Sequence, residues 1–89
     1  MAEFLVETYI ARGDLTGPAK RARRARVVAE QLRREGEPVR YVRSIFVPED
    51  ETCFYLFEAP SIDAVFETAR RASLRVDRIT ETKPDGKGG

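Results

Sequence analysis

Residues 43–61, RSIFVPEDETCFYLFEAPS, read as two strands joined by an acidic turn, and this hairpin decides the fold. Pro48 ends the first run, and residues 48–51 (PEDE) have the composition of a hairpin loop. In the second run, residues 53–57 (CFYLF) are all apolar or aromatic. A strand with one face in water alternates apolar and polar side chains, so we expect both faces of this strand to be covered.

Strand composition extends to other parts of the chain, where Val, Ile, Thr, Tyr and Phe alternate with polar residues. The predicted strands are residues 3–10 (EFLVETYI), 39–47 (VRYVRSIFV), 52–58 (TCFYLFE) and 75–82 (RVDRITET).

Two segments have the apolar spacing of helices. The first starts near Thr16-Gly17-Pro18 and ends at Glu35, before Gly36 and Pro38. The second starts after Ser61, a favoured N-cap residue. We expect the stripes facing the sheet to be Ala22, Ala25, Val28, Ala29 and Leu32 in the first helix, and Ile62, Val65, Phe66, Ala69 and Ala72 in the second.

The resulting β-α-β-β-α-β order predicts an α+β fold, the ferredoxin-like plait. Its four-stranded antiparallel sheet carries both helices on one face, because right-handed crossovers place them there. We expect residues 1–82 to form this single domain and residues 83–89 (KPDGKGG) to be a disordered C-terminal tail.

The sheet face without helices is expected to be apolar. If Phe4, Val6, Val42 and Phe46 point at the helices, then Leu5, Tyr9, Tyr41 and Ile45 point away. Both sides of the third strand are also apolar, so a monomer would expose a patch on the order of several hundred Å², more than soluble monomers usually show. We therefore predict a homodimer formed through the sheet side. A small apolar ligand is the alternative occupant.

Composition excludes several kinds of protein. The chain has no histidine and one cysteine, Cys53, which rules out a Ser-His-Asp triad, a four-cysteine zinc site and an iron–sulfur cluster within one chain. No haem or nucleotide cofactor is expected. No apolar run is long enough to cross a membrane, and the N-terminus lacks the basic region of a signal peptide, so we expect a cytoplasmic protein without a membrane partner.

Whether the protein is an enzyme stays open, although a non-enzyme is favoured and no catalytic residue is assigned. If it is a cofactor-free enzyme, such as an isomerase or cyclase, Glu7, Tyr41, Arg43 and Tyr55 are the side chains that would line its cavity. RNA-recognition domains share the element order, but their third strand is preceded by basic residues and glycine, whereas this one is preceded by EDET. Nucleic acid is therefore not expected as a partner.

The candidate metal residues are the consecutive acids Glu49, Asp50 and Glu51 in the hairpin turn. Carboxylates favour hard divalent cations, and an ordinary acidic turn is the simpler interpretation. We expect Cys53 to pack in the sheet as a small apolar residue.

The chain also resembles a known family. FLVE near the start, RSIFVPEDETCFYLFEAPS and AVFETARRASLRVDRI are similar to segments of small actinobacterial-type nickel-binding proteins, a family long described as of unknown function. The resemblance covers roughly residues 3–80. It implies a homodimer of ferredoxin-like plaits that binds nickel at its surface, for sequestration, and it assigns no ligand in this chain.

Overall fold

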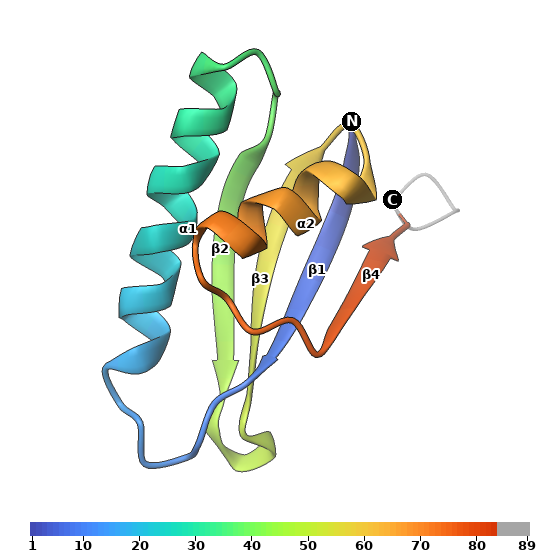
Figure 1. Cartoon of the computed structure of the whole chain (residues 1–89). Coiled ribbons are helices and arrows are strands. Elements are labelled where there is room, and N and C mark those ends of the chain that lie inside the picture. Colours follow the sequence, from blue (N-terminus) through green and yellow to red (C-terminus); the bar gives the residue numbers. More distant parts are fainter. Residues whose placement is uncertain (84–89) are drawn as a thin grey trace.

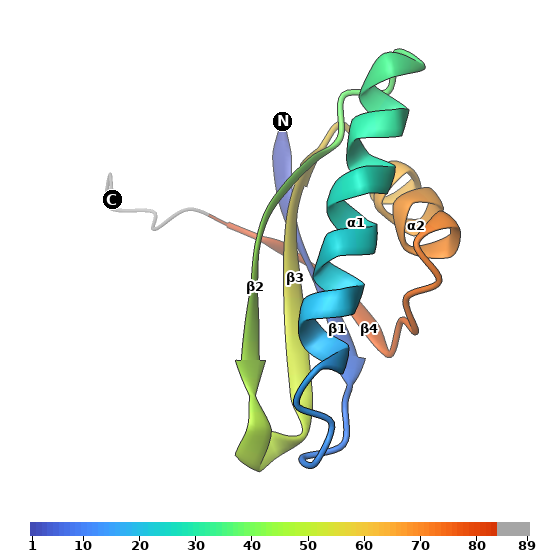
Figure 2. The same cartoon turned by 90° about the vertical axis from the view of Figure 1, so that its left-hand side faces the viewer.

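The fold is a four-stranded sheet with two helices on one face (Figures 1 and 2). It is seen in a computed structural model that describes residues 1–83. The predicted tail, apart from Lys83, lies outside the described residues. The elements, in chain order, are β1 (Ala2–Tyr9), α1 (Gly17–Arg34), β2 (Arg40–Val47), the 3-10 helix η1 (Pro48–Asp50), β3 (Thr52–Ala59), α2 (Ile62–Arg71) and β4 (Arg78–Thr82).

The sheet has the strand order β2-β3-β1-β4, and all neighbours are antiparallel. Strands β2 and β3 form the predicted hairpin, with η1 as its turn. The strands at the centre, β3 and β1, are paired over their whole length, from Ala2 opposite Ala59 to Tyr9 opposite Thr52. The prediction of a ferredoxin-like plait is confirmed.

The helices begin and end for local reasons. Helix α1 ends in a Schellman motif, since the N–H of Glu37 donates to the carbonyl of Leu32 at 2.8 Å and that of Gly36 to Arg33 at 3.1 Å. Gly36 has a φ of 94°, a conformation that glycine adopts without steric cost. At the start of α2, the Ser61 hydroxyl accepts a hydrogen bond from the Ala64 N–H at 3.3 Å.

The core lies between the helices and the sheet. Ala25 and Ala29 of α1 are completely buried, and their small side chains let the helix lie close to the strands. Helix α2 differs from the predicted stripe: Val65, Ala69 and Ala72 are buried, but Ile62 and Phe66 are 42% and 49% exposed. The face of α2 that meets the sheet is therefore rotated toward Ala64 and Thr68, which are buried.

Burial along β1 and β3 shows which side of each strand faces the helices. In β1 the residues that face the helices are Phe4, Val6 and Thr8. In β3 they are Cys53, Tyr55, Phe57 and Ala59, all completely buried. Cys53 thus packs in the core, as expected from its sequence context. The other side of β3, with Phe54 and Leu56, belongs to the face without helices, which we call the open face.

A bulge in β2 overturns one expectation about the faces. The register steps from Tyr41 opposite Phe57 to Arg43 opposite Leu56, which leaves Val42 as an extra residue. Tyr41 therefore lies on the helix side and packs edge-on against Phe57, with 5.8 Å between the ring centroids. The expectation that Tyr41 points away from the helices is wrong, and Val42, expected to face them, is 36% exposed.

In residues 1–83, no helix is both long enough and apolar enough to span a bilayer.

Candidate functional site

The acidic turn is fastened to the segment that follows β1. Glu51 has left-handed backbone angles, with φ 51° and ψ 42°. Its Oε2 accepts hydrogen bonds from the Arg12 N–H at 3.0 Å and from the Tyr9 hydroxyl at 3.4 Å. The Arg12 guanidinium also donates to the Glu49 carbonyl oxygen at 3.2 Å. The Glu51 carboxylate thus has a structural role in holding the turn against the chain.

The other two acids of the turn point into solvent. Glu49 and Asp50 are exposed, and within residues 1–83 neither side chain makes a hydrogen bond or an ion pair. Over the same range, no group of three or more His, Cys, Asp or Glu side chains is placed to hold a metal ion. The structure therefore does not bring Glu49, Asp50 and Glu51 together around one position.

The donor types of the chain do not fit a preformed nickel site in one subunit. Nickel is well served by imidazole nitrogen, but the sequence has no histidine. The single thiol, Cys53, is completely buried, and this burial raises its pKa, which disfavours the thiolate that a metal needs. Oxygen ligands from carboxylates, carbonyls and water remain for a divalent cation.

The four side chains considered for an enzyme are divided between the two faces of the sheet. Glu7 and Arg43 lie on the open face, where Phe54 and Leu56 of β3 separate them. Tyr55 is completely buried on the helix side, and Tyr41 lies on that side as well, with the Arg26 guanidinium 5.3 Å from its ring centroid. These side chains therefore do not form the wall of a single cavity.

Tyr55 has an unusual polar environment. Its hydroxyl is buried and has no hydrogen-bond partner of normal geometry among the described residues. Burial raises the pKa of this phenol far above its ordinary value, and the nearby Cys53 thiol adds to the shift. A phenol is neutral at physiological pH even without this shift, and burial makes the Tyr55 hydroxyl inaccessible to a substrate.

The open face combines an apolar centre with charges of both signs. Its centre contains Leu5, Phe54 and Leu56, which are half-buried, and Ile45, which is 39% exposed. By register, Glu7 lies between Phe54 and Arg78, and Arg43 lies beside Leu56. A surface of this kind can pack against a second copy of itself, because acidic side chains of one copy can face basic side chains of the other.

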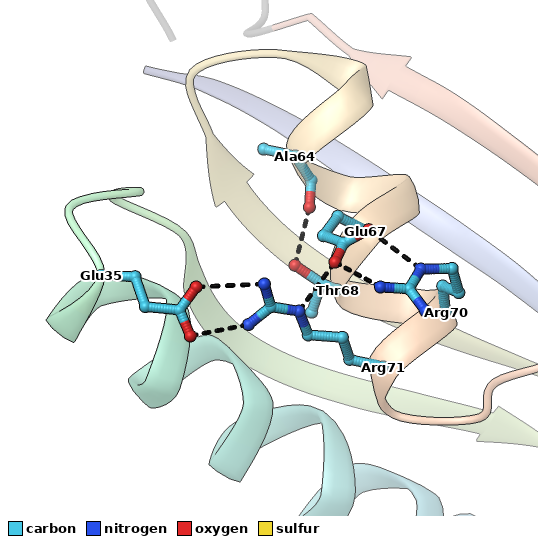
Figure 3. A network of polar contacts seen from close by, with 6 residues as sticks. All are labelled: Glu35, Ala64, Glu67, Thr68, Arg70 and Arg71. Atoms are coloured by element: carbon cyan, nitrogen blue, oxygen red, sulfur yellow. Dashed lines mark hydrogen bonds and ion pairs between the residues drawn. The ribbon is translucent and has the colours of Figure 1, made fainter.

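The helix side carries an ion network that crosses from α1 to α2 (Figure 3). Arg71 binds Glu35 through two hydrogen bonds, of 2.9 and 3.0 Å, and its Nε donates to Glu67 at 2.7 Å. Arg70 also binds Glu67, and together the two arginines lower the pKa of that carboxyl to about 2. The i,i+4 spacing of Glu67 and Arg71 is visible in the sequence, whereas the pairing with Glu35 depends on how the helices pack.

Two grooves adjoin this network, and Arg71 lines both. One has a volume of about 450 Å³ and is predominantly acidic, with Glu35, Glu37, Asp63 and Glu67 in its walls. The other is about 240 Å³ and is lined by Arg23, Arg24, Val27, Val28, Arg71 and Ala72. No residue of either groove was among the candidate site residues predicted from the sequence.

Comparisons with known proteins agree with one another on the kind of protein this chain resembles. A family model described as nickel responsive protein SCO4226-like matches residues 4–82. Among solved structures, the crystal structure of SCO4226 from Streptomyces coelicolor A3(2) is similar, with a TM-score of 0.73 and 25% sequence identity. The alignment covers 96% of this chain and 100% of that one. None of the curated proteins matches the chain.

Proposed function

Because the chain belongs to the SCO4226-like family of nickel responsive proteins, we propose that it acts as a homodimer that binds divalent cations such as nickel. Family membership confirms the resemblance seen in the sequence. The proposed activity is weak cation binding and sequestration by oxygen ligands at the acidic turn, without catalysis. The observation that carries the proposal is that Glu49 and Asp50 are exposed and that neither side chain makes an ion pair within residues 1–83, in a member of a nickel-related family.

The open face supports the homodimer. Its apolar centre of Leu5, Ile45, Phe54 and Leu56 would be removed from water by a second copy, which would also add burial to a small domain. The charges around this centre favour a copy of the same chain over a purely acidic or basic partner, since Arg43 and Glu7 could meet across the twofold axis.

The acidic turn supports cation binding by its exposure and its ligand chemistry. Glu49 and Asp50 supply hard oxygen donors, and the second oxygen of Glu51 lies on the same turn. The three carboxylates do not converge on one position within a subunit, so the other ligands of a bound cation would be water or the same turn of another copy. We expect weak binding, with a dissociation constant on the order of 10⁻⁴–10⁻³ M, which is the range of the weakest oxygen-ligand sites for Ca²⁺ in proteins.

Sedimentation velocity tests the dimer. The wild-type protein should sediment as a dimer, and Phe54→Asp or Leu56→Asp should shift it to the monomer. Phe66→Asp is the matched control, because Phe66 is also exposed but lies on α2, and it should leave the dimer intact. A wild-type protein that stays monomeric at high concentration would refute this part of the proposal.

Calorimetric titration with nickel chloride tests the cation site. The double substitution Glu49→Ala and Asp50→Ala should abolish the heat of binding. The control is the double substitution Glu3→Ala and Glu81→Ala, which removes the same charge from two exposed residues at the other end of the sheet. This control should preserve the heat of nickel binding. Absence of heat with millimolar nickel, or equal loss in both variants, would exclude the acidic turn as the site.

A further inference from the structure

The smaller groove on the helix side has features that the proposed function does not use. It lies where the middle of α1 meets the C-terminal end of α2 (Figure 1). Val27, Val28 and Ala72 form its apolar surface, and Val27 is 49% exposed on a helix whose other exposed residues are mostly arginine and lysine. Figure 2 shows both helices on one side of the sheet, and the groove is lined by residues of α1 and of the end of α2. A homodimer formed through the open face would therefore leave the groove accessible.

We propose that this groove binds an acidic peptide segment of a partner protein, with one apolar side chain of the segment packed on Val27, Val28 and Ala72. Acidic residues on either side of that anchor would pair with Arg23 and with the neighbouring cations of α1.

Two of the groove's arginines are already held in place by the protein. The Arg24 Nε donates to the Ala72 carbonyl at 2.7 Å, and its Nη2 donates to Ser73 at 3.4 Å, at the C-terminal end of α2. Arg71 is fixed by Glu35 and Glu67 (Figure 3). The walls of the groove are therefore formed before binding, which lowers the entropic cost of receiving a ligand.

The remaining charges have no use within the described fold. Residues 20–34 contain seven basic side chains and one acid, Glu30. The side chains of Arg23 and Lys20 are exposed and make no hydrogen bond or ion pair within residues 1–83. Lys20 lies in the first turn of α1, where a cation opposes the helix dipole. An anionic partner would offset this unfavourable arrangement by charge complementarity.

Size and surroundings favour a peptide over other anions. The groove, at about 240 Å³, is smaller than the roughly 300–1,000 Å³ typical of small-molecule sites, so it suits one side chain. Beyond Arg71, the larger groove presents Glu35, Glu37, Asp63 and Glu67. These carboxylates would repel a phosphate backbone that continued across the helices. A short acidic segment avoids them.

Fluorescence anisotropy with a labelled synthetic peptide tests the proposal. The peptide consists of Glu and Asp residues around one central leucine, and a second peptide has serine in place of the leucine. We expect the leucine peptide to bind more tightly, with an affinity that falls as salt screens the charges. Arg23→Glu should weaken binding about tenfold, and Val27→Asp by at least as much.

The matched control is Arg34→Glu, which makes the same charge change on the same exposed side of α1, outside the groove. It should change affinity less than about twofold at physiological salt. Equal loss in Arg34→Glu and Arg23→Glu, equal binding of the two peptides, or no binding would overturn the proposal. Binding of a single-stranded oligonucleotide or of phosphatidylglycerol vesicles in preference to the leucine peptide would also overturn it.

Discussion

The guanidinium of Arg71 in α2 forms a two-point ion pair with the carboxylate of Glu35, just beyond α1, with N···O distances of 2.9 and 3.0 Å. Paired parallel hydrogen bonds of this kind restrict orientation as well as distance. Arg71 also reaches Glu67 one turn earlier in its own helix. A single side chain thus connects the two helices and separates an acidic groove from a basic one.

The first prediction concerns acid stability. In the folded protein, hydrogen bonds from Arg70 and Arg71 lower the pKa of Glu67 from 4.5 to about 2, and Arg71 also lowers the pKa of Glu35. A carboxylate with a lowered folded pKa contributes stability above its unfolded pKa, and this contribution is lost as pH falls from about 4.5 toward 2. The thermal unfolding midpoint should therefore drop through this window.

Glu67→Gln should make that drop smaller in a series of thermal unfolding curves between pH 7 and pH 2. Glu49→Gln removes one carboxylate that has no ion pair within residues 1–83, and it should leave the pH dependence close to that of the wild type. The same curve for wild type and Glu67→Gln would show that the network contributes nothing to stability.

The second prediction concerns the buried hydroxyl of Tyr55. A buried polar group without a hydrogen bond costs roughly 1–3 kcal/mol. Tyr55→Phe removes the hydroxyl and keeps the ring, so we expect the free energy of unfolding to rise by up to about 1 kcal/mol. Tyr55→Ala should instead lose about 3–5 kcal/mol, because it leaves a cavity in the core. Urea denaturation measures both, and a marked loss in Tyr55→Phe would indicate a partner for the hydroxyl.

The third prediction concerns the start of α2. Removal of the Ser61 hydroxyl leaves the Ala64 N–H without its capping acceptor. Ser61→Ala should therefore lower the free energy of unfolding by about 1 kcal/mol, and Ser61→Asp should preserve it. Chemical denaturation of the three proteins at neutral pH provides the comparison. Equal stability of the alanine and aspartate variants would argue against the cap.

The fourth prediction concerns the thiol of Cys53. Because the side chain is completely buried and burial raises its pKa, it should react with Ellman's reagent at pH 8 only after guanidinium unfolds the protein. Raising the pKa of a thiol on folding stabilises the protein below the unfolded pKa, near 9, and this stabilisation is lost as pH rises through the folded value. Rapid reaction of the native protein would show that β3 opens readily.

Much of the fold follows from local sequence chemistry. Pro48, Gly36 and Ser61 mark the hairpin turn, the end of α1 and the start of α2 because each residue type favours one backbone conformation or one capping bond. The spacing of apolar residues, two for strands and about 3.6 for helices, then predicts the order of elements. A chain with the order β-α-β-β-α-β can adopt only a few topologies.

The geometry of the candidate site could be predicted from the sequence only in part. The sequence places Glu49, Asp50 and Glu51 next to one another. It does not show that the Glu51 carboxylate accepts a hydrogen bond from the N–H of Arg12, a residue far away in the chain. Likewise, the apolar spacing that predicted Ile62 and Phe66 as core residues does not reveal how α2 is rotated on the sheet. Contacts between segments far apart in the chain depend on how the elements pack, and the local pattern of residues does not determine this packing.

By itself, the sequence determined the order of strands and helices, the capping residues, the absence of histidine ligands and the uneven distribution of charge. Only the tertiary structure decided that Tyr55 faces the helices, that the bulge at Val42 moves Tyr41 to the same side, and that Arg71 pairs with Glu35. The physical reason is that strand side chains alternate with a period of two, so one extra residue reverses a face. Ion pairs between helices depend in the same way on register and rotation.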